Sequence, residues 1–200
     1  MSTFDIKQYS YKAIIFDCDG TLVNSAPAHF AAYQSALQHQ GAVFNLDWYQ
    51  QRLGLSRVEL LTEFSDYTSI QLDIAQAVAE SEAQFLVRAS ELTAISEVVH
   101  IAKSHYGQLP MGVASSGLKL GVHLSLESLQ IDHLFEVVLK ADDVSNCKPD
   151  PEIYILAAQK LQTDISACLV FEDTDEGLAS ASSAGAQFVD VRTFAALYSK

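Results

Sequence analysis

The sequence predicts an α/β protein, a doubly wound parallel sheet into which a small α-helical domain is inserted. Three observations lead to this fold class. The chain contains five short apolar runs of the kind that form buried strands, helical patterns separate the later runs, and the segment after the first run has helical patterns only. Strands and helices that alternate at this spacing form a parallel sheet with helices on both faces, which binds its ligands at the C-terminal ends of the strands.

The individual elements follow from these patterns. Strands are expected at Ala13–Phe16, Met111–Ala114, Val137–Leu139, Cys168–Phe171 and Phe188–Val191. Core helices, with apolar positions three and four residues apart, are expected near Lys119–Leu129, Glu152–Leu161 and Gly177–Ala184.

The alternation stops between about Ser25 and Ser90. Helices are expected here at Ala28–Gln40, Leu46–Arg52, Val58–Phe64 and Leu72–Arg88, the last with an apolar stripe of Ile74, Val78, Phe85 and Leu86. A helical block inserted after the first strand is consistent with a lid above the strand ends. We therefore expect a core domain of residues 1–24 and 91–200 and a helical cap domain of residues 25–90.

Composition narrows the class of protein. The 200 residues, 49% of them hydrophobic, can form a sizeable core, and no apolar run is long enough to cross a bilayer. The chain carries 25 Asp and Glu against 12 Lys and Arg, a net charge of −13 without a basic stripe, which argues against nucleic acid as a partner. Cys18, Cys147 and Cys168 lack the spacing of a disulfide framework or a zinc site. With no export signal in MSTFDIKQYSYK, we expect a cytoplasmic monomer with reduced thiols.

The segment AIIFDCDGTL, Ala13–Leu22, carries the strongest chemical signal. Alternation along a strand places Asp17 and Asp19 on one side and Cys18 on the other. Two carboxylates repel each other unless a cation or a proton lies between them. The pair therefore indicates a divalent metal, a nucleophile beside an acid, or both, and a simple Asp-Gly turn is the alternative.

Two further strands end in candidate phosphate ligands. Ser115 and Ser116 open a helix, where hydroxyls and free backbone N–H groups can hold an anion, although serine also serves there as an ordinary cap. Lys148 precedes Asp150, which lies between two prolines that fix the backbone. The lysine is either a fixed positive charge facing the first carboxylates or a solvated side chain before a turn.

The fourth apolar run ends in Glu172 and Asp173, carboxylates of the kind that hold Mg²⁺ through a few protein oxygens and several waters. Asp175 and Glu176 favour the start of the following helix through its dipole. Polar groups at the ends of four separate strands of one sheet are difficult to attribute to capping alone.

Four segments, Asp17-Cys18-Asp19-Gly20-Thr21, Ser115, Lys148-Pro149 and Glu172-Asp173, resemble the four signature motifs of the haloacid dehalogenase superfamily of phosphatases. The helical insert resembles the small cap of the β-phosphoglucomutase-like and phosphoglycolate phosphatase-like branch. The tail FEDTDEGLASASSAGAQFVDVR looks most like that of bacterial fructose-1-phosphate phosphatases.

The resemblance implies a magnesium-dependent phosphatase that acts on small phosphorylated metabolites, such as fructose 1-phosphate. Asp17 would attack phosphorus and form an aspartyl-phosphate, and Asp19 would protonate the leaving group and then deprotonate water. The implied Mg²⁺ ligands are Asp17, the backbone carbonyl of Asp19, Asp173 and Glu172, the last directly or through water. The implied phosphate ligands are Thr21, Ser115, Ser116 and Lys148.

The resemblance also implicates three cap residues, His29, Gly54 and Arg57, in substrate recognition or acid positioning. Alternatively, His29 is simply a packed or exposed histidine, and Arg57 is a surface residue of the cap without such a role. Leu53 stands where the mutases have a lysine, and Thr21 replaces their usual valine, which weakens the mutase interpretation.

Two other functions compete with a phosphatase. A sugar phosphomutase would release an isomerised sugar phosphate rather than free phosphate. A receiver-like phospho-acceptor domain also combines aspartate, hydroxyl and lysine, but carries its acceptor on a middle strand and has no helical insert. A dehalogenase is disfavoured because Asp19 would have no leaving group to protonate.

Overall fold

The computed structural model describes residues 6–194 and contains a five-stranded parallel sheet. The strands are β1 (Ala13–Phe16), β4 (Met111–Ala114), β5 (Val137–Leu139), β6 (Cys168–Glu172) and β7 (Gln187–Asp190), in the spatial order β5-β4-β1-β6-β7. The predicted doubly wound α/β fold is confirmed. Two strands differ slightly from the prediction: β6 ends one residue later, at Glu172, and β7 begins and ends one residue before the predicted run.

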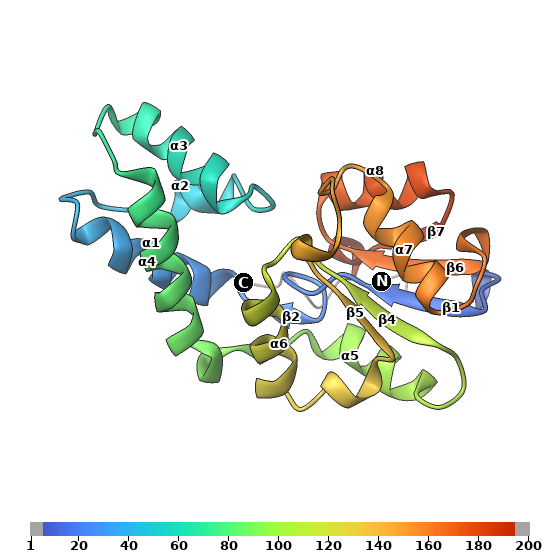
Figure 1. Cartoon of the computed structure of the whole chain (residues 1–200). Helices are drawn as coiled ribbons and strands as arrows, with labels where there is room; N and C mark the ends of the chain where they lie inside the picture. The colour runs from blue at the N-terminus through green and yellow to red at the C-terminus, as the bar shows by residue number, and fades with distance from the viewer. Residues whose placement is uncertain (1–5, 195–200) are drawn as a thin grey trace. The chain divides into compact units, whose positions relative to one another are not determined.

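Helices cover both faces of this sheet (Figure 1). They are α5 (Ser96–His105) and α6 (Lys119–Ser128) on one face, and α7 (Glu152–Lys160) and α8 (Asp175–Ala184) on the other. Ile153, Tyr154 and Ala157 of α7 pack in one core cluster with Ile15 and Val170 of the sheet. Helix α5, whose buried residues are Val98, Val99 and Ala102, was not predicted from the sequence.

The register of the strands brings their C-terminal ends to one edge. Phe16 of β1 lies opposite Val113 of β4 and Phe171 of β6, and Ala114 lies opposite Leu139 of β5. The residues that follow these strands therefore emerge side by side, which is how segments far apart in the sequence come to share a site.

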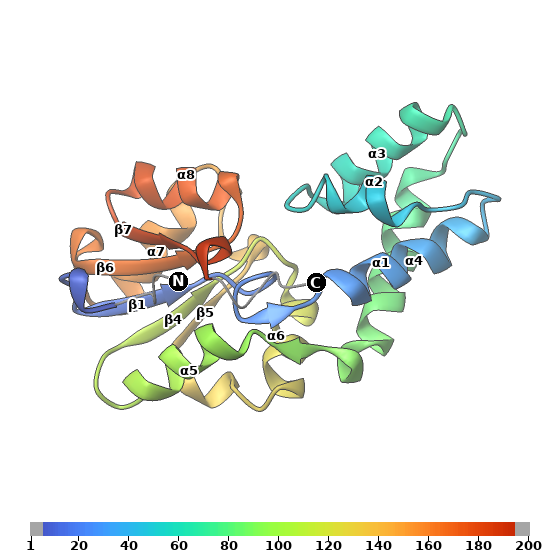
Figure 2. The same ribbon diagram turned by 180° about the vertical axis from the view of Figure 1, so that it is seen from behind.

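The chain divides into two compact units, one formed by the residues up to Asn24 and from Thr93 onward, the other by Ser25–Leu92. In the first unit, β2 (Val23–Asn24) and β3 (Thr93–Ala94) form a short antiparallel ribbon, seen in Figure 2. Each strand has two residues, too few for a periodic pattern, so the ribbon was not predicted. Short 3₁₀ helices span Ile6–Gln8, Ala89–Glu91, Asp132–Leu134, Ala141–Asp143, Ile165–Ala167 and Val191–Thr193.

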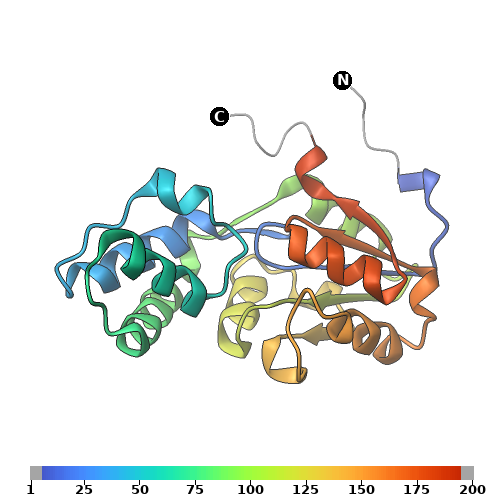
Figure 3. The same cartoon turned by 90° about the horizontal axis from the view of Figure 1, so that it is seen from above.

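The second unit is entirely helical in the regular structure it contains (Figure 3). Its helices are α1 (Ala26–Gln38), α2 (Leu46–Gln50), α3 (Arg57–Thr68) and α4 (Ile74–Val87). Asn45 and Asp73 cap the N-termini of α2 and α4 with their side chains, and Ser56 forms a capping box with Glu59 at the start of α3. Local capping therefore supports the helices that the sequence predicts.

The core of the helical unit is aromatic. The ring centroid of Phe44 lies within 5.9 Å of those of Tyr33, Trp48, Tyr49 and Phe64. The predicted stripe on α4 is only partly right, because the fully or nearly fully buried residues of that helix are Ala77, Ser81 and Phe85, whereas Ile74, Val78 and Leu86 are half-buried. A pattern of apolar positions does not include the polar Ser81.

Among residues 6–194, no helix combines the length and apolar character needed to cross a membrane.

Candidate active site

The loop that follows β1 begins with a tight turn. The backbone carbonyl of Cys18 accepts the N–H groups of Thr21, Leu22 and Val23 at 3.3, 2.9 and 2.9 Å. The strand itself ends at Phe16, so Asp17 and Asp19 lie in the turn. The N–H of Asp17 still donates to the carbonyl of Phe171 on β6, at 2.9 Å. This bond holds the Asp17 carboxylate beside the end of the neighbouring strand.

Lys148 lies at the centre of the site. Its ammonium donates to Asp17 Oδ1 at 2.8 Å, Glu172 Oε1 at 2.6 Å and the carbonyl of Ala114 at 3.0 Å. The side chain is only 4% exposed, and its three N–H donors have three acceptors. Of the two interpretations left open by the sequence, the structure therefore favours a fixed positive charge facing the first carboxylates.

Glu172 accepts hydrogen bonds on both oxygens. Oε1 accepts from Lys148 and from the hydroxyl of Tyr154, which lies at 3.0 Å. Oε2 accepts from the N–H of Asp173 and from both the N–H and the hydroxyl of Thr174, at 2.9, 2.9 and 3.0 Å. Glu172 is thus a buried carboxylate whose orientation is determined from several sides.

Two glycines leave room for the carboxylates. A Cβ atom at Gly20, where φ is +86°, would collide with the carboxylate of Asp173, and a Cβ at Gly177 would collide with that of Glu172. Thr21 is fully buried, and its hydroxyl donates to Asp173 Oδ1 at 3.2 Å. Substitution of either glycine would therefore displace an acidic side chain of the site.

Burial and mutual repulsion change the proton affinities of these groups. Burial, and then repulsion from Glu172, raises the pKa of Asp173 to about 7. Burial also raises the pKa of Asp17 well above its usual range, although Lys148 opposes the change. Burial acts against the ionised forms of Glu172 and Lys148 too, but their mutual attraction prevails, so the pKa of Glu172 is lowered and that of Lys148 is raised. The site therefore disfavours the simultaneous ionisation of its three carboxyl groups.

The acidic groups fit a divalent cation. Asp17, Glu172 and Asp173 each offer an oxygen, and these oxygens lie within 4.8 Å of one another. Three carboxyl groups lie around the ammonium of Lys148, so a divalent cation would reduce the repulsion that, after burial, raises the pKa values of Asp17 and Asp173. Oxygen donors of this kind suit hard cations such as Mg²⁺.

The segment after β4 lies beside these groups. Ser115 is buried, and its hydroxyl accepts the N–H of Gly117 at 3.0 Å, whereas Ser116 is exposed. A Cβ at Gly117 would lie 3.3 Å from Asp19 Oδ2 and 3.2 Å from Ser115 Oγ. The structure therefore places the side chains of Asp19 and Ser115 close to each other, beside Gly117.

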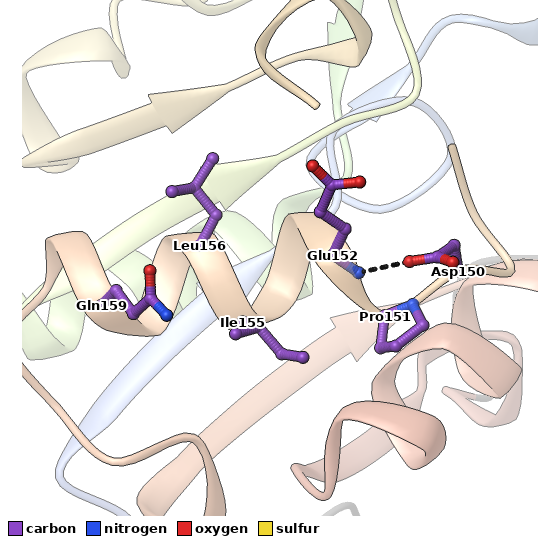
Figure 4. Close-up of a pocket in the computed structure, with 6 residues that line it drawn as sticks. All are labelled: Asp150, Pro151, Glu152, Ile155, Leu156 and Gln159. Carbon is purple, nitrogen blue, oxygen red and sulfur yellow. Dashed lines mark hydrogen bonds between the residues drawn. The ribbon is translucent and has the colours of Figure 1, made fainter. Parts of the chain in front are cut away.

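The loop before Lys148 is fixed by the first turn of α7. The carboxylate of Glu152 accepts the N–H groups of Ser145 and Asn146 at 3.0 and 2.9 Å. The N–H of Glu152 in turn donates to Asp150 Oδ1 at 3.0 Å, the dashed line in Figure 4. The surface hollow drawn there, about 390 Å³ in volume, is lined by residues 150–152, 155, 156 and 159 and by none of the predicted site residues.

The three predicted residues of the helical unit fall into one cluster and one turn. Arg57 Nη2 lies 3.4 Å from His29 Nδ1, and Arg57 Nη1 donates to Ser81 Oγ at 3.3 Å. The His29 ring stacks on Phe85, with centroids 4.1 Å apart. Gly54, with φ of +99°, lies in the turn between α2 and α3. The structure thus places His29 and Arg57 in direct contact, which their spacing in the sequence did not reveal.

Residues 14–191 match the family model described as haloacid dehalogenase-like hydrolase. The chain belongs to this family of hydrolases. A relative, the fructose-1-phosphate phosphatase YqaB of Escherichia coli, is 30% identical over 91% of this chain and 97% of its own length. The phosphorylated carbohydrates phosphatase of Thermotoga maritima is 29% identical over 87% of this chain and 82% of its own.

The fold of this hydrolase also matches solved structures. The crystal structure of CbbY from Rhodobacter sphaeroides in complex with phosphate superposes with a TM-score of 0.78 at 22% identity, covering 89% of this chain and 84% of the other. At this identity the likeness supports the fold alone. The match to the family model over residues 14–191 confirms the family that the four motifs resemble.

Three site residues of this hydrolase were not predicted from the sequence. Tyr154 falls within a predicted core helix, and only its hydroxyl among apolar neighbours could have marked it. Thr174 and Gly177 have the spacing of a helix cap, and Thr174 does accept the N–H of Gly177 at 3.1 Å. Nothing in the sequence indicated that both also contact or make room for Glu172.

Proposed function

We propose that this protein is a magnesium-dependent phosphatase that hydrolyses small phosphorylated sugars, such as fructose 1-phosphate, through an aspartyl-phosphate on Asp17. One observation carries the proposal. The buried ammonium of Lys148 contacts Asp17 and Glu172, and Asp173 completes a group of three carboxylates at the same strand ends. A nucleophile, a fixed cation and a group able to hold a metal are the parts that phosphoryl transfer requires.

The first half of the reaction transfers the phosphoryl group to the enzyme. A carboxylate oxygen of Asp17 attacks phosphorus, and the bond from phosphorus to the sugar oxygen breaks. Asp19 gives its proton to that leaving oxygen. In the second half, Asp19 takes a proton from a water molecule, whose oxygen attacks phosphorus. This step releases inorganic phosphate and restores the Asp17 carboxylate.

The remaining residues stabilise charge during these steps. Lys148 would hold an equatorial oxygen of the phosphoryl group, with Ser115, Ser116 and Thr21 as further proposed phosphate ligands. Asp17, the backbone carbonyl of Asp19, Asp173 and Glu172 would hold Mg²⁺. When bound, the metal supplies positive charge opposite the phosphoryl oxygens and screens the carboxylates from each other.

Substrate choice is proposed to depend on the helical unit, as a cap domain. The cluster of His29 and Arg57 offers donors to hydroxyl or phosphate groups of a sugar, and Gly54 allows the turn that precedes Arg57. The relatives named for phosphorylated carbohydrates and fructose 1-phosphate support a sugar phosphate as the substrate. We further propose that the enzyme acts as a cytoplasmic monomer.

The test is a panel of phosphorylated sugars assayed for phosphate release with Mg²⁺. Asp17→Asn should abolish release and also the phosphoryl adduct that mass spectrometry detects on the wild-type protein. Asp66→Asn, a change at an exposed position of the helical unit, is the matched control and should be fully active. A folded Asp17→Asn variant with near-wild-type activity would refute the proposal.

The same assay separates the competing functions. An isomerised sugar phosphate without free phosphate would identify a phosphomutase. A phosphoryl group that persists on Asp17 for hours without turnover would identify a receiver-like domain.

A further inference from the structure

Tyr154 is completely buried on α7, among the apolar residues that pack this helix on the sheet. A phenylalanine would fill the same volume without a polar atom in the core. A buried hydroxyl is unfavourable unless it forms a hydrogen bond, and that of Tyr154 donates to Glu172 Oε1 at 3.0 Å. The hydroxyl therefore connects the core of α7 to the acidic site at the end of β6.

The aromatic ring of Tyr154 contacts a second charged group of the site, the ammonium of Lys148. Lys148 Nζ lies 4.9 Å from the ring centroid, within the range of a cation–π contact. One side chain thus touches both members of the Lys148–Glu172 ion pair, the ammonium with its ring and the carboxylate with its hydroxyl.

We infer that Tyr154 is a positioning residue, whose hydroxyl fixes Glu172 and through it the ammonium of Lys148 in the orientation that phosphoryl transfer requires. This role rests on the proposed function and belongs to a residue outside the four motifs. Glu172 Oε1 has two donors, Lys148 and Tyr154. Without the hydroxyl, Lys148 is the one donor to that oxygen left among residues 6–194, and both side chains gain freedom to move.

The effect should be largest in the transition state. In the transition state, a preorganised donor such as the Lys148 ammonium stabilises the charge on the equatorial phosphoryl oxygens. A small displacement of this donor therefore reduces the rate more than it weakens ground-state binding. A tyrosine that only filled the core would instead change stability and leave the kinetic constants of the folded enzyme unaltered.

The experiment compares Tyr154→Phe with Tyr106→Phe in the full chain. Tyr106 belongs to the same unit, is 55% exposed and serves as the matched control. For Tyr154→Phe we expect kcat to fall about tenfold (~1.4 kcal/mol) with KM changed less than about twofold. Inhibition by orthovanadate, which imitates the five-coordinate phosphorus, should weaken about tenfold, whereas inhibition by inorganic phosphate should change less than about twofold. Tyr106→Phe should match the wild type throughout.

A double-mutant cycle tests the route through Glu172. In a Glu172→Gln background, Tyr154→Phe should lower kcat by much less than it does alone, since the partner that it positions has already changed. The melting temperature of each variant separates loss of folded enzyme from loss of rate.

The outcomes distinguish this inference from the proposed function. A wild-type protein that releases no phosphate from any substrate refutes both. An active wild type, with Tyr154→Phe indistinguishable from Tyr106→Phe or with vanadate and phosphate weakened equally, refutes only the role of Tyr154.

Discussion

Replacing Lys148 with methionine removes the single ammonium that lies between two buried carboxylates. Methionine keeps an unbranched side chain of similar length but carries no charge. In the wild type, the Lys148 side chain is 4% exposed, those of Asp17 and Glu172 are 8% and 1% exposed, and the N–O distances are 2.8 and 2.6 Å. The substitution therefore leaves two desolvated negative charges without their common partner.

The size of the effect follows from these distances. At an effective dielectric constant of about 20, each of the two ion pairs contributes about 6 kcal/mol of attraction. This figure is an upper bound on the loss of stability, because the variant also no longer has to remove an ammonium group from water. Removing one partner of a buried ion pair costs about 3–5 kcal/mol. For a chain of this length that is a loss of roughly 6–20 °C in melting temperature.

The loss should depend on pH. Lys148 lowers the pKa values of both Asp17 and Glu172, so its removal raises the pKa of Asp17 still further above its usual range and removes the main cause that keeps the pKa of Glu172 low. A carboxyl group whose pKa is higher in the folded than in the unfolded state contributes stability below the unfolded pKa, and this stability is lost as the pH rises through the folded value. The variant should therefore be closest to the wild type near pH 5 and furthest from it near pH 8.

Thermal unfolding with a metal chelator measures this difference at each pH. Lys140→Met is the control, because Lys140 forms a 2.7 Å pair with Asp143 at a more exposed position, where pairs contribute about 0–1 kcal/mol. Phosphate release by Lys148→Met should also fall at least about 10²-fold, since a stabilising charge is removed. A melting-temperature difference that is the same at pH 5 and pH 8, together with nearly full activity, would contradict the placement of Lys148 between two ionised carboxylates.

Three further predictions concern the metal and the surroundings of the site. A chelator should abolish phosphate release and Mg²⁺ should restore it. The rise in melting temperature that Mg²⁺ gives the wild type should vanish in Asp173→Asn, and a rise that persists in this variant would contradict the proposed metal site. Gly177→Ala should lower both stability and activity, because the Cβ of alanine would collide with the carboxylate of Glu172. This collision should outweigh the helix propensity of alanine, which exceeds that of glycine by about 1 kcal/mol. An unchanged melting temperature would contradict this prediction. Iodoacetamide at pH 8 should label the exposed Cys147 at least roughly tenfold faster than Cys168, because burial raises the pKa of Cys168 to about 11. Mass spectrometry of the labelled peptides measures the two rates, and faster labelling of Cys168 would contradict this prediction.

Much of the fold could be predicted from the sequence because buried parallel strands leave a strong local signal. Four of the five strand predictions coincide with observed strands to within one residue at the end, and the fifth is displaced by one residue. Elements without such a signal were missed. The two-residue strands Val23–Asn24 and Thr93–Ala94 form only by pairing with each other, and a local sequence pattern cannot predict pairing between segments so far apart in the chain.

The site shows the same division. Asp17, Lys148 and Glu172 could be named because parallel strands end at one edge, so polar residues after several strands must gather there. The contact between His29 and Arg57 depends on how α1 and α3 pack, and the residue types alone do not reveal it.

By itself, the sequence determined most of the strands and helices in their order along the chain, the chemistry of the residues at the strand ends and, through the motifs they form, the family. These properties depend on short stretches of chain, where periodicity and residue type act locally. Only the tertiary structure decided that Tyr154, which lies within a predicted helix, reaches Glu172, and that Gly20 and Gly177 make room for carboxylates. Distances between segments many residues apart arise from packing, and packing decides which buried polar groups find partners.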